Sequence, residues 1–205
     1  MIESERDLQD YFLKLLENNS FNFIEIKNED ELIANFKKQF ELFNNISLTD
    51  SEFSDIYNYL INDVSFDKLM EGHDSYSFMD LDDFNSNIFQ VSQEITMKSD
   101  YTNRYDVTIL INGIPIIQVE LKKMGVELKE AFNQIKRYDA HTYSGLFSYV
   151  QIFVISNNVN TRYFFNDHDF DYDNSFNWFD FNHLDEFTNS FLTIDNLAQL
   201  LNFYI

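Results

Sequence analysis

Two apolar runs joined by Asn112-Gly113 constrain the fold of this 205-residue chain more than any other segment. The first run extends from Tyr105 to Ile111, and the second from Ile114 to Lys122. Asn-Gly between two such runs is a strong signal for a β-hairpin, because both central positions of the tightest turn need a positive φ angle. The sequence therefore predicts a hairpin within a β-rich core.

Charged residues interrupt this hairpin at a few positions. Glu120 and Lys122 are two residues apart, so a strand points both side chains to the same face. A charge in such an apolar strand costs several kcal/mol unless it is paired or bound to a metal ion. Asp106 lies near the far end of the partner strand. Phosphodiester cleavage requires divalent cations held by oxygen ligands, so Asp106 and Glu120 are candidate Mg²⁺ ligands, and Lys122 is a candidate for orienting the attacking water.

The register of the hairpin decides whether these residues can meet. A tight turn at Asn112-Gly113 without any irregularity would leave Asp106 and Glu120 on opposite faces. A shared metal site therefore requires either a loop of odd length, which pairs Asp106 with Glu120, or a β-bulge near Asp106. An ordinary ion pair on an edge strand remains the alternative for Glu120 and Lys122.

Apolar periodicity predicts secondary structure over the rest of the chain. Helices are expected at 4–17, 29–43, 50–62, 126–138, 184–192 and 195–203. Strands are expected at 21–26, 88–91, 95–97, 150–155 and 162–165. The remaining long segments, 71–87 and the acidic, aromatic 166–180, are expected to be loops, and no chemistry is assigned to either of them.

Composition limits the possible partners. The chain has 35 acidic and 14 basic residues, a formal charge of −21, which is the reverse of what an autonomous DNA-binding module shows. Cysteine is absent, which excludes disulfides and thiolate sites. No signal peptide and no apolar run long enough for a bilayer are found, so we expect a cytoplasmic protein without membrane contact. Any work on DNA would need delivery by other subunits or domains, because the shortage of basic residues argues against a free-standing nuclease.

Several ordered blocks together resemble the N-terminal nuclease domain of the restriction subunit of type I restriction-modification enzymes, in the PD-(D/E)xK superfamily. The blocks are Asn103-Arg104-Tyr105-Asp106-Val107, Asn112-Gly113-Ile114-Pro115, Val119-Glu120-Leu121-Lys122, Gln134-Ile135-Lys136-Arg137-Tyr138, 146–157 and 161–164. The resemblance extends over nearly the whole chain and implies an α/β fold. The expected core is of the restriction-endonuclease type, a central mixed β-sheet flanked by helices, with helical N- and C-terminal additions.

The resemblance also implies functional roles. It identifies Asp106, Glu120 and Lys122 as the catalytic residues of a Mg²⁺-dependent endonuclease for double-stranded DNA, and Gln134 and Tyr138 as a supporting motif that engages DNA. The implied partners are the methylation and specificity subunits and an ATP-driven translocase region of the same subunit. ATP binding is expected only in that full-length subunit, because this chain has no phosphate-binding G-x-x-x-x-G-K-[ST] loop.

The domain organisation expected from these patterns is one nuclease domain over 1–205. It divides into a helical part at 1–87, a catalytic core at 88–165, and an acidic loop with helices at 166–205 that leads toward the translocase region.

Three points remain open in the sequence. Some family members have a further acid in the first helix; Glu5 or Asp7 is available here, while Gln9 occupies a nearby position. Asn158 stands where the family often has glycine, and Asn tolerates the left-handed conformation that such a turn needs. A non-catalytic acidic module that docks on proteins or mimics DNA is the alternative function.

Overall fold

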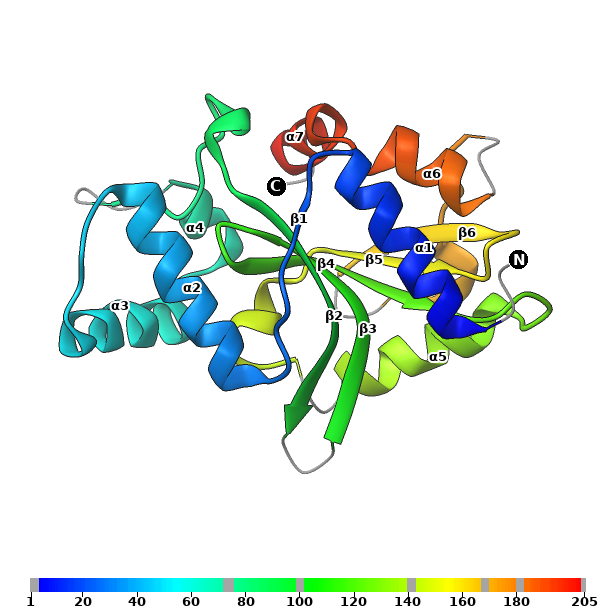
Figure 1. The fold of residues 1–205 in the computed structure, drawn as a ribbon, viewed down its shortest axis with the longest axis horizontal. Helices are drawn as coiled ribbons and strands as arrows, with labels where there is room; N and C mark the ends of the chain where they lie inside the picture. The colour runs from blue at the N-terminus through cyan, green and yellow to red at the C-terminus, as the bar shows by residue number, and fades with distance from the viewer. Residues whose placement is uncertain are drawn as a thin grey trace.

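The structure is a computed structural model that describes residues 4–71, 76–98, 102–139, 143–166, 170–179 and 183–203. Within these residues it contains a six-stranded mixed β-sheet flanked by helices (Figure 1). This arrangement confirms the predicted α/β class. The part of the chain that is described has no helix both long enough and apolar enough to cross a membrane.

The sheet has the order β1-β2-β3-β4-β5-β6, so neighbours in sequence are also neighbours in space. The strands are β1 (Asn22–Phe23), β2 (Phe89–Lys98), β3 (Thr102–Ile111), β4 (Ile114–Leu121), β5 (Ile152–Ser156) and β6 (Thr161–Phe165). The pairs β1–β2 and β4–β5 are parallel, and the other three pairs are antiparallel. The central strand β4 is buried along its whole length, as its apolar sequence requires.

The helices lie within two residues of their predicted bounds. They are α1 (Glu5–Asn18), α2 (Glu29–Asn44), α3 (Asp50–Asp63), α5 (Leu128–Asp139), α6 (Leu184–Phe191) and α7 (Ile194–Phe203). Reciprocal capping boxes begin α1 at Ser4 and α3 at Thr49, which explains why these two helix starts are readable from sequence. A short helix, α4 (Phe66–Glu71), was not predicted.

Helices cover both faces of the sheet near β5 and β6. Adjacent residues on a strand point to opposite faces, and on β6 the ring of Tyr163 contacts Phe191 of α6, whereas Phe164 contacts Phe132 of α5. Helix α1 contacts α6 on the first of these faces. The parallel β4–β5 pair needs a crossover, and α5 provides it on the second face.

Three sequence predictions about the N-terminal half need correction. The strand predicted at 21–26 pairs as a ladder only at Asn22–Phe23, because the Ile26 N–H donates to the Ser92 hydroxyl instead of a backbone carbonyl. The two strands predicted at 88–91 and 95–97 are one strand, β2, which keeps the same register with β3 on both sides of Glu94, a residue with φ +57°. The predicted loop at 71–87 contains a 3-10 turn at Phe84–Ser86, and its residues 72–75 lie outside the described part.

The predicted turn at Asn112-Gly113 is confirmed. Both residues have positive φ angles, +50° and +82°, and Ile111 pairs with Ile114 across the turn. The Asn112 side chain accepts the Ile88 N–H at 2.8 Å and donates to the Phe78 carbonyl at 2.9 Å, so it fixes the turn against the segment before β2.

Candidate active site

A β-bulge in the central hairpin brings the two candidate metal ligands to the same face. Beyond the tight turn, Leu110 pairs with Pro115 but Ile109 pairs with Ile117, so β4 has one extra residue at this point. Val107 then pairs with Val119, and continuing this register puts Asp106 opposite Glu120. The predicted bulge is therefore confirmed, and the alternative of an odd-length loop is wrong.

The bulge lies beside the turn rather than beside Asp106, where the sequence analysis expected it. Pro115 accounts for this position, because proline has no N–H to donate to the ladder and is tolerated in sheets at edges and bulges. A single irregularity next to the turn therefore changes the register of every residue that follows it, including both carboxylates.

Asp106 and Glu120 are both buried. Asp106 has 7% of its surface exposed, and its Oδ2 accepts the backbone N–H of Leu121 at 2.8 Å. Glu120 is fully buried; its Oε1 accepts a hydrogen bond from Lys122 at 3.1 Å, and its Oε2 has no hydrogen-bond partner among the described residues. A buried acceptor without a donor costs about 1–3 kcal/mol, so this site is arranged at the expense of stability.

Lys122 connects the carboxylates to helix α5. Its Nζ donates to Glu120 Oε1 and, at 2.8 Å, to Gln134 Oε1. Gln134 Nε2 donates in turn to the Tyr138 hydroxyl, which donates to the backbone carbonyl of Arg104 at 3.1 Å. Four of the five residues predicted from the sequence, Glu120, Lys122, Gln134 and Tyr138, thus lie in one connected hydrogen-bond network that fixes the Lys122 ammonium group. Asp106 is held separately, by the N–H of Leu121.

The electrostatics of the pair favour a bound proton or cation. Burial raises the pKa of Glu120 well above its usual range, and the adjacent Asp106 raises it further, despite the opposing effect of Lys122. Burial also raises the pKa of Asp106, although the hydrogen bond from Leu121 works against that shift. Two carboxylates in this environment repel each other when both are ionised, and a positive charge between them would relieve the repulsion.

An open cleft of about 730 Å³ gives access to this network. Asp106, Lys122, Gln134 and Tyr138 contribute to its walls. Three more charged residues that the sequence analysis did not assign also line it: Glu5, Arg104 and Arg137. Strand and helix spacing could have indicated two of them, since Arg104 is two residues from Asp106 on β3 and Arg137 is three residues from Gln134 on α5.

The cleft also distinguishes the acids of the first helix. Glu5 lines the cleft, and its charge contributes to the raised pKa of Asp106. Asp7 is instead part of the helix cap, where its carboxylate accepts the Ser4 N–H at 3.0 Å. Gln9 is buried, with 4% of its surface exposed. Glu5 is thus the acid of α1 that faces the site.

The residues present are suited to a magnesium ion. Mg²⁺ is typically held by one or two carboxylates and keeps several water or phosphate ligands. Asp106 and Glu120 provide two hard oxygen ligands, and Glu120 Oε2 is the buried oxygen that lacks a donor. The described residues contain no group of three or more Asp, Glu, His or Cys side chains arranged for a metal, so an ion held by this pair would need further ligands from water or a phosphate.

The chain also matches a known protein family. Residues 2–172 match the family described as type I restriction enzyme R protein N terminus. The chain belongs to this family. The resemblance inferred from the sequence is therefore confirmed, and the matched range includes Asp106, Glu120, Lys122, Gln134 and Tyr138.

Individual relatives are described as endonuclease subunits of type I restriction enzymes. The endonuclease subunit of the type I restriction enzyme SsaAORF53P from Staphylococcus saprophyticus is 34% identical, over 99% of this chain and 24% of that subunit. The SauCOLORF180P endonuclease subunit from Staphylococcus aureus is 35% identical over the same shares. The EcoprrI endonuclease subunit from Escherichia coli is 34% identical over 80% of this chain and 59% of that subunit. The chain thus spans about a quarter of the length of the staphylococcal relatives.

Proposed function

We propose that this chain is the Mg²⁺-dependent endonuclease module of a type I restriction enzyme and hydrolyses phosphodiester bonds of double-stranded DNA. The observation that carries the proposal is that Asp106 and Lys122 line one open cleft, while the bulge in β4 puts the buried Glu120 opposite Asp106 and in hydrogen-bond contact with Lys122. Glu120 Oε2, buried without a donor, adds a reason for a cation at this point.

Asp106 and Glu120 would hold the cation. When bound, Mg²⁺ polarises the phosphate and lowers the pKa of water. Lys122 has its ammonium group fixed by Glu120 and Gln134, which leaves one of its three N–H donors available to the cleft. This donor can orient the attacking water and stabilise the negative charge that develops on the phosphate.

Gln134 and Tyr138 act as positioning residues in this proposal. Gln134 holds Lys122, and Tyr138 anchors Gln134 to the backbone of β3. Both line the cleft and are therefore also within reach of DNA. A helix in contact with β4 and β5 provides a rigid support for the catalytic lysine.

The charge of −21 indicates that DNA is delivered to this module. The proposed partners are the methylation and specificity subunits, together with an ATP-driven translocase region of the same subunit, in the cytoplasm. An acidic docking module or DNA mimic would also carry such a charge, but it would not need a charged pair buried in its central strand.

The test is cleavage by the assembled restriction enzyme with Lys122→Ala in this chain. We expect cutting to fall at least about 100-fold, as for loss of a group that stabilises transition-state charge, while ATP hydrolysis continues. Lys123→Ala is the matched control, because Lys123 is the exposed neighbour and should leave cutting unchanged. Cutting that persists in the Lys122 variant would refute the proposed function.

A titration of the unsubstituted chain with Mg²⁺ or Mn²⁺ separates the two functions by a second route. A nuclease module should bind the ion and lose this binding with Asp106→Asn. A docking module should not respond to the added ion, and Asp106→Asn should not change its binding properties.

A further inference from the structure

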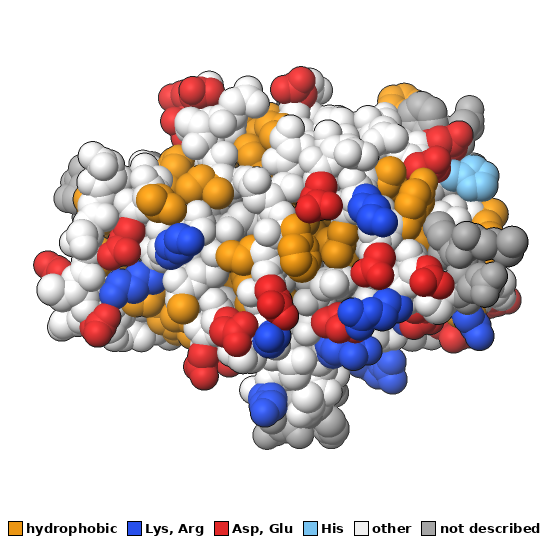
Figure 2. Space-filling view, viewed as in Figure 1, with side chains coloured by type: hydrophobic (Ala, Val, Ile, Leu, Met, Phe, Trp, Pro, Cys, Tyr) orange, Lys and Arg blue, Asp and Glu red, His pale blue; other side chains and the backbone are white. Residues whose placement is uncertain are grey.

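Helix α5 is electrostatically unlike the other α-helices of the described part of the chain. It carries three basic and two acidic residues, whereas each of the others carries more acidic than basic residues. Figure 2 shows Lys and Arg side chains gathered in the region where Figure 1 has α5 and the N-terminal end of α1. In a protein with a charge of −21, a basic helix beside the candidate active site points to an anionic partner on this face.

The basic residues of α5 form one exposed stripe. Lys129, Asn133, Lys136 and Arg137 are spaced at i, i+4, i+7 and i+8, which places them on the same side of a helix, and all four are exposed. The opposite side contributes Leu128, Ala131 and Ile135 to the core. Arg137, at one end of the stripe, lines the catalytic cleft.

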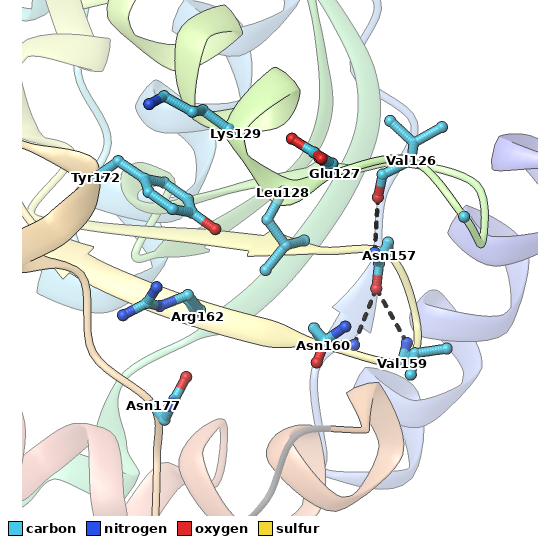
Figure 3. Close-up of a pocket in the computed structure, with 11 residues that line it drawn as sticks. Val126, Glu127, Leu128, Lys129, Asn157, Val159, Asn160, Arg162, Tyr172 and Asn177 are labelled. Carbon is cyan, nitrogen blue, oxygen red and sulfur yellow. Dashed lines mark hydrogen bonds between the residues drawn. The ribbon is translucent and has the colours of Figure 1, made fainter.

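The other end of the stripe reaches a second cavity. This cavity, of about 730 Å³, is lined by the first turn of α5 with Lys129, by Arg162 of β6 and by Tyr172 of the acidic, aromatic loop. We call it the Tyr172 cavity. Figure 3 shows the Tyr172 ring between the two cations; Arg162 lies 5.2 Å and Lys129 Nζ 5.9 Å from the ring centroid. The stripe thus connects two cavities that both contain Lys or Arg side chains.

The walls of the Tyr172 cavity are fixed. The Asn157 side chain donates to the Val126 carbonyl at 2.7 Å and accepts the N–H groups of Val159 and Asn160 at 3.2 and 2.9 Å (Figure 3). Asn158 has φ +73°, in the left-handed region, as the sequence analysis expected for this turn. Asn157 therefore ties the segment before α5 to the β5–β6 turn, and the cavity needs little rearrangement to accept a ligand.

Arg162 retains donor capacity in this cavity. One of its Nη atoms donates to the Ser175 carbonyl at 2.7 Å. Its Nε is buried and has no hydrogen-bond partner among the described residues, so the donors open to a ligand are the remaining N–H groups of the two Nη atoms. A guanidinium group has five N–H donors, so the bond to Ser175 holds the group in place and leaves donors for a ligand. A planar, fixed guanidinium is well suited to the oxygens of a phosphate.

We propose that the α5 stripe and the Tyr172 cavity bind the backbone of the same DNA whose scissile phosphate occupies the catalytic cleft. The proposal rests on the nuclease function proposed above and assigns a second phosphate contact, made by Lys129 and Arg162. From Lys129 to Arg137 the helix rises about 12 Å, which corresponds to roughly three to four base-pair steps of B-DNA at about 3.4 Å each. The stripe thus extends the contact beyond the scissile bond.

The test is the affinity of the chain for a labelled 20-base-pair duplex, measured by fluorescence anisotropy in Ca²⁺ over a range of salt concentrations. The salt slope is the slope of the logarithm of the binding constant against the logarithm of the salt concentration. Removal of one phosphate-binding side chain should lower its magnitude by about 0.9, which corresponds to about an eightfold decrease in affinity at 0.1 M salt. We expect this change for Lys129→Ala and for Arg162→Gln. Lys38→Ala, at an exposed lysine on α2, is the matched control and should change neither quantity.

Substitution of Glu127 provides a second test, in which the affinity for DNA is expected to increase. It is the acidic side chain among the residues that line the Tyr172 cavity, so Glu127→Gln should strengthen binding to the duplex if a phosphate is bound there. Weaker binding by this variant would contradict the proposal. Displacement of the duplex by ATP from the unsubstituted chain, but not from Lys129→Ala, would show that the cavity takes a free nucleotide and would also overturn it.

The outcomes separate this inference from the nuclease function. Suppose that the unsubstituted chain binds DNA, and that Lys129→Ala and Arg162→Gln bind it with unchanged affinity and salt slope. The second phosphate contact is then refuted, but the proposed catalytic cleft is not. If the unsubstituted chain binds no DNA in this assay, the proposed contact is overturned, and cleavage by the Lys122 variant then decides separately whether the nuclease function fails with it.

Discussion

Replacing Glu120 by Gln should stabilise the protein in the absence of metal. Glutamine keeps an oxygen for the hydrogen bond from Lys122, and its amide can donate to Asp106, so the buried acceptor without a donor is removed. Giving a buried acceptor of this kind a hydrogen-bond partner raises the free energy of unfolding by about 1–3 kcal/mol. For a chain of this size, each kcal/mol shifts the melting temperature by about 2–4 °C, which gives an expected rise of about 2–12 °C in EDTA.

The stabilisation should depend on pH with a defined sign. The pKa of Glu120 in the folded protein is raised above its ordinary value of 4.5. The stability that the protonated Glu120 side chain contributes is therefore fully present below about pH 4.5 and is lost as the pH rises through the pKa of the folded state. The melting temperature of Glu120→Gln should therefore match the unsubstituted chain at about pH 4 and exceed it increasingly toward pH 8.

Added Mg²⁺ should remove most or all of the difference between the two proteins, and should reverse it where the gain from the ion exceeds the gain from the substitution. The unsubstituted chain gains about 2.7 kcal/mol when Mg²⁺ is present at about 100 times its dissociation constant, and the variant should gain nothing. Glu17→Gln, exposed on α1, controls for loss of a carboxylate as such. Thermal scans by circular dichroism measure all three proteins, and a variant that melts lower in EDTA at pH 8, or responds to Mg²⁺ like the unsubstituted chain, would refute the reasoning.

Two further predictions concern the hairpin and the lysine support. Gly113→Ala should lower the free energy of unfolding by about 2–4 kcal/mol in urea, because Gly113 has φ +82° and a Cβ atom there would lie 2.8 Å from the Phe36 Cα; an unchanged midpoint would contradict the tight turn. Gln134→Ala should lower kcat for DNA cleavage about 10- to 100-fold, and Gln134→Glu, which retains an acceptor for Lys122, should recover part of that activity. Equal effects of the two Gln134 variants would count against a positioning role.

Much of the site was readable from sequence because its information is local. Glu120 and Lys122 lie two residues apart on a strand, and Gln134 and Tyr138 lie four apart on a helix, so each pair faces one direction whatever the rest of the fold does. The Asn-Gly turn fixes the hairpin in the same local way. Counting residues between Asp106 and Glu120 also showed that the hairpin needs either an odd-length loop or a bulge, although it did not decide between the two.

The parts that escaped prediction depend on contacts between distant segments. The left-handed Glu94 on β2 arises from how whole strands align, and nothing in the neighbouring residues specifies it. The bulge lies beside Pro115, a signal that is present in the sequence but was not used to place the bulge. The Tyr172 cavity joins α5, β6 and a loop to which the sequence analysis assigned no chemistry. Glu5 was separable from Asp7 only once the cap and the cleft were both visible.

Location of a Mn²⁺ ion in crystals of the chain tests the central claim most directly. Anomalous scattering should reveal a peak about 2 Å from carboxylate oxygens of both Asp106 and Glu120, and the peak should be missing in crystals of Asp106→Asn. Manganese bound elsewhere on the protein, with no peak between these two side chains at a saturating concentration, would contradict the account.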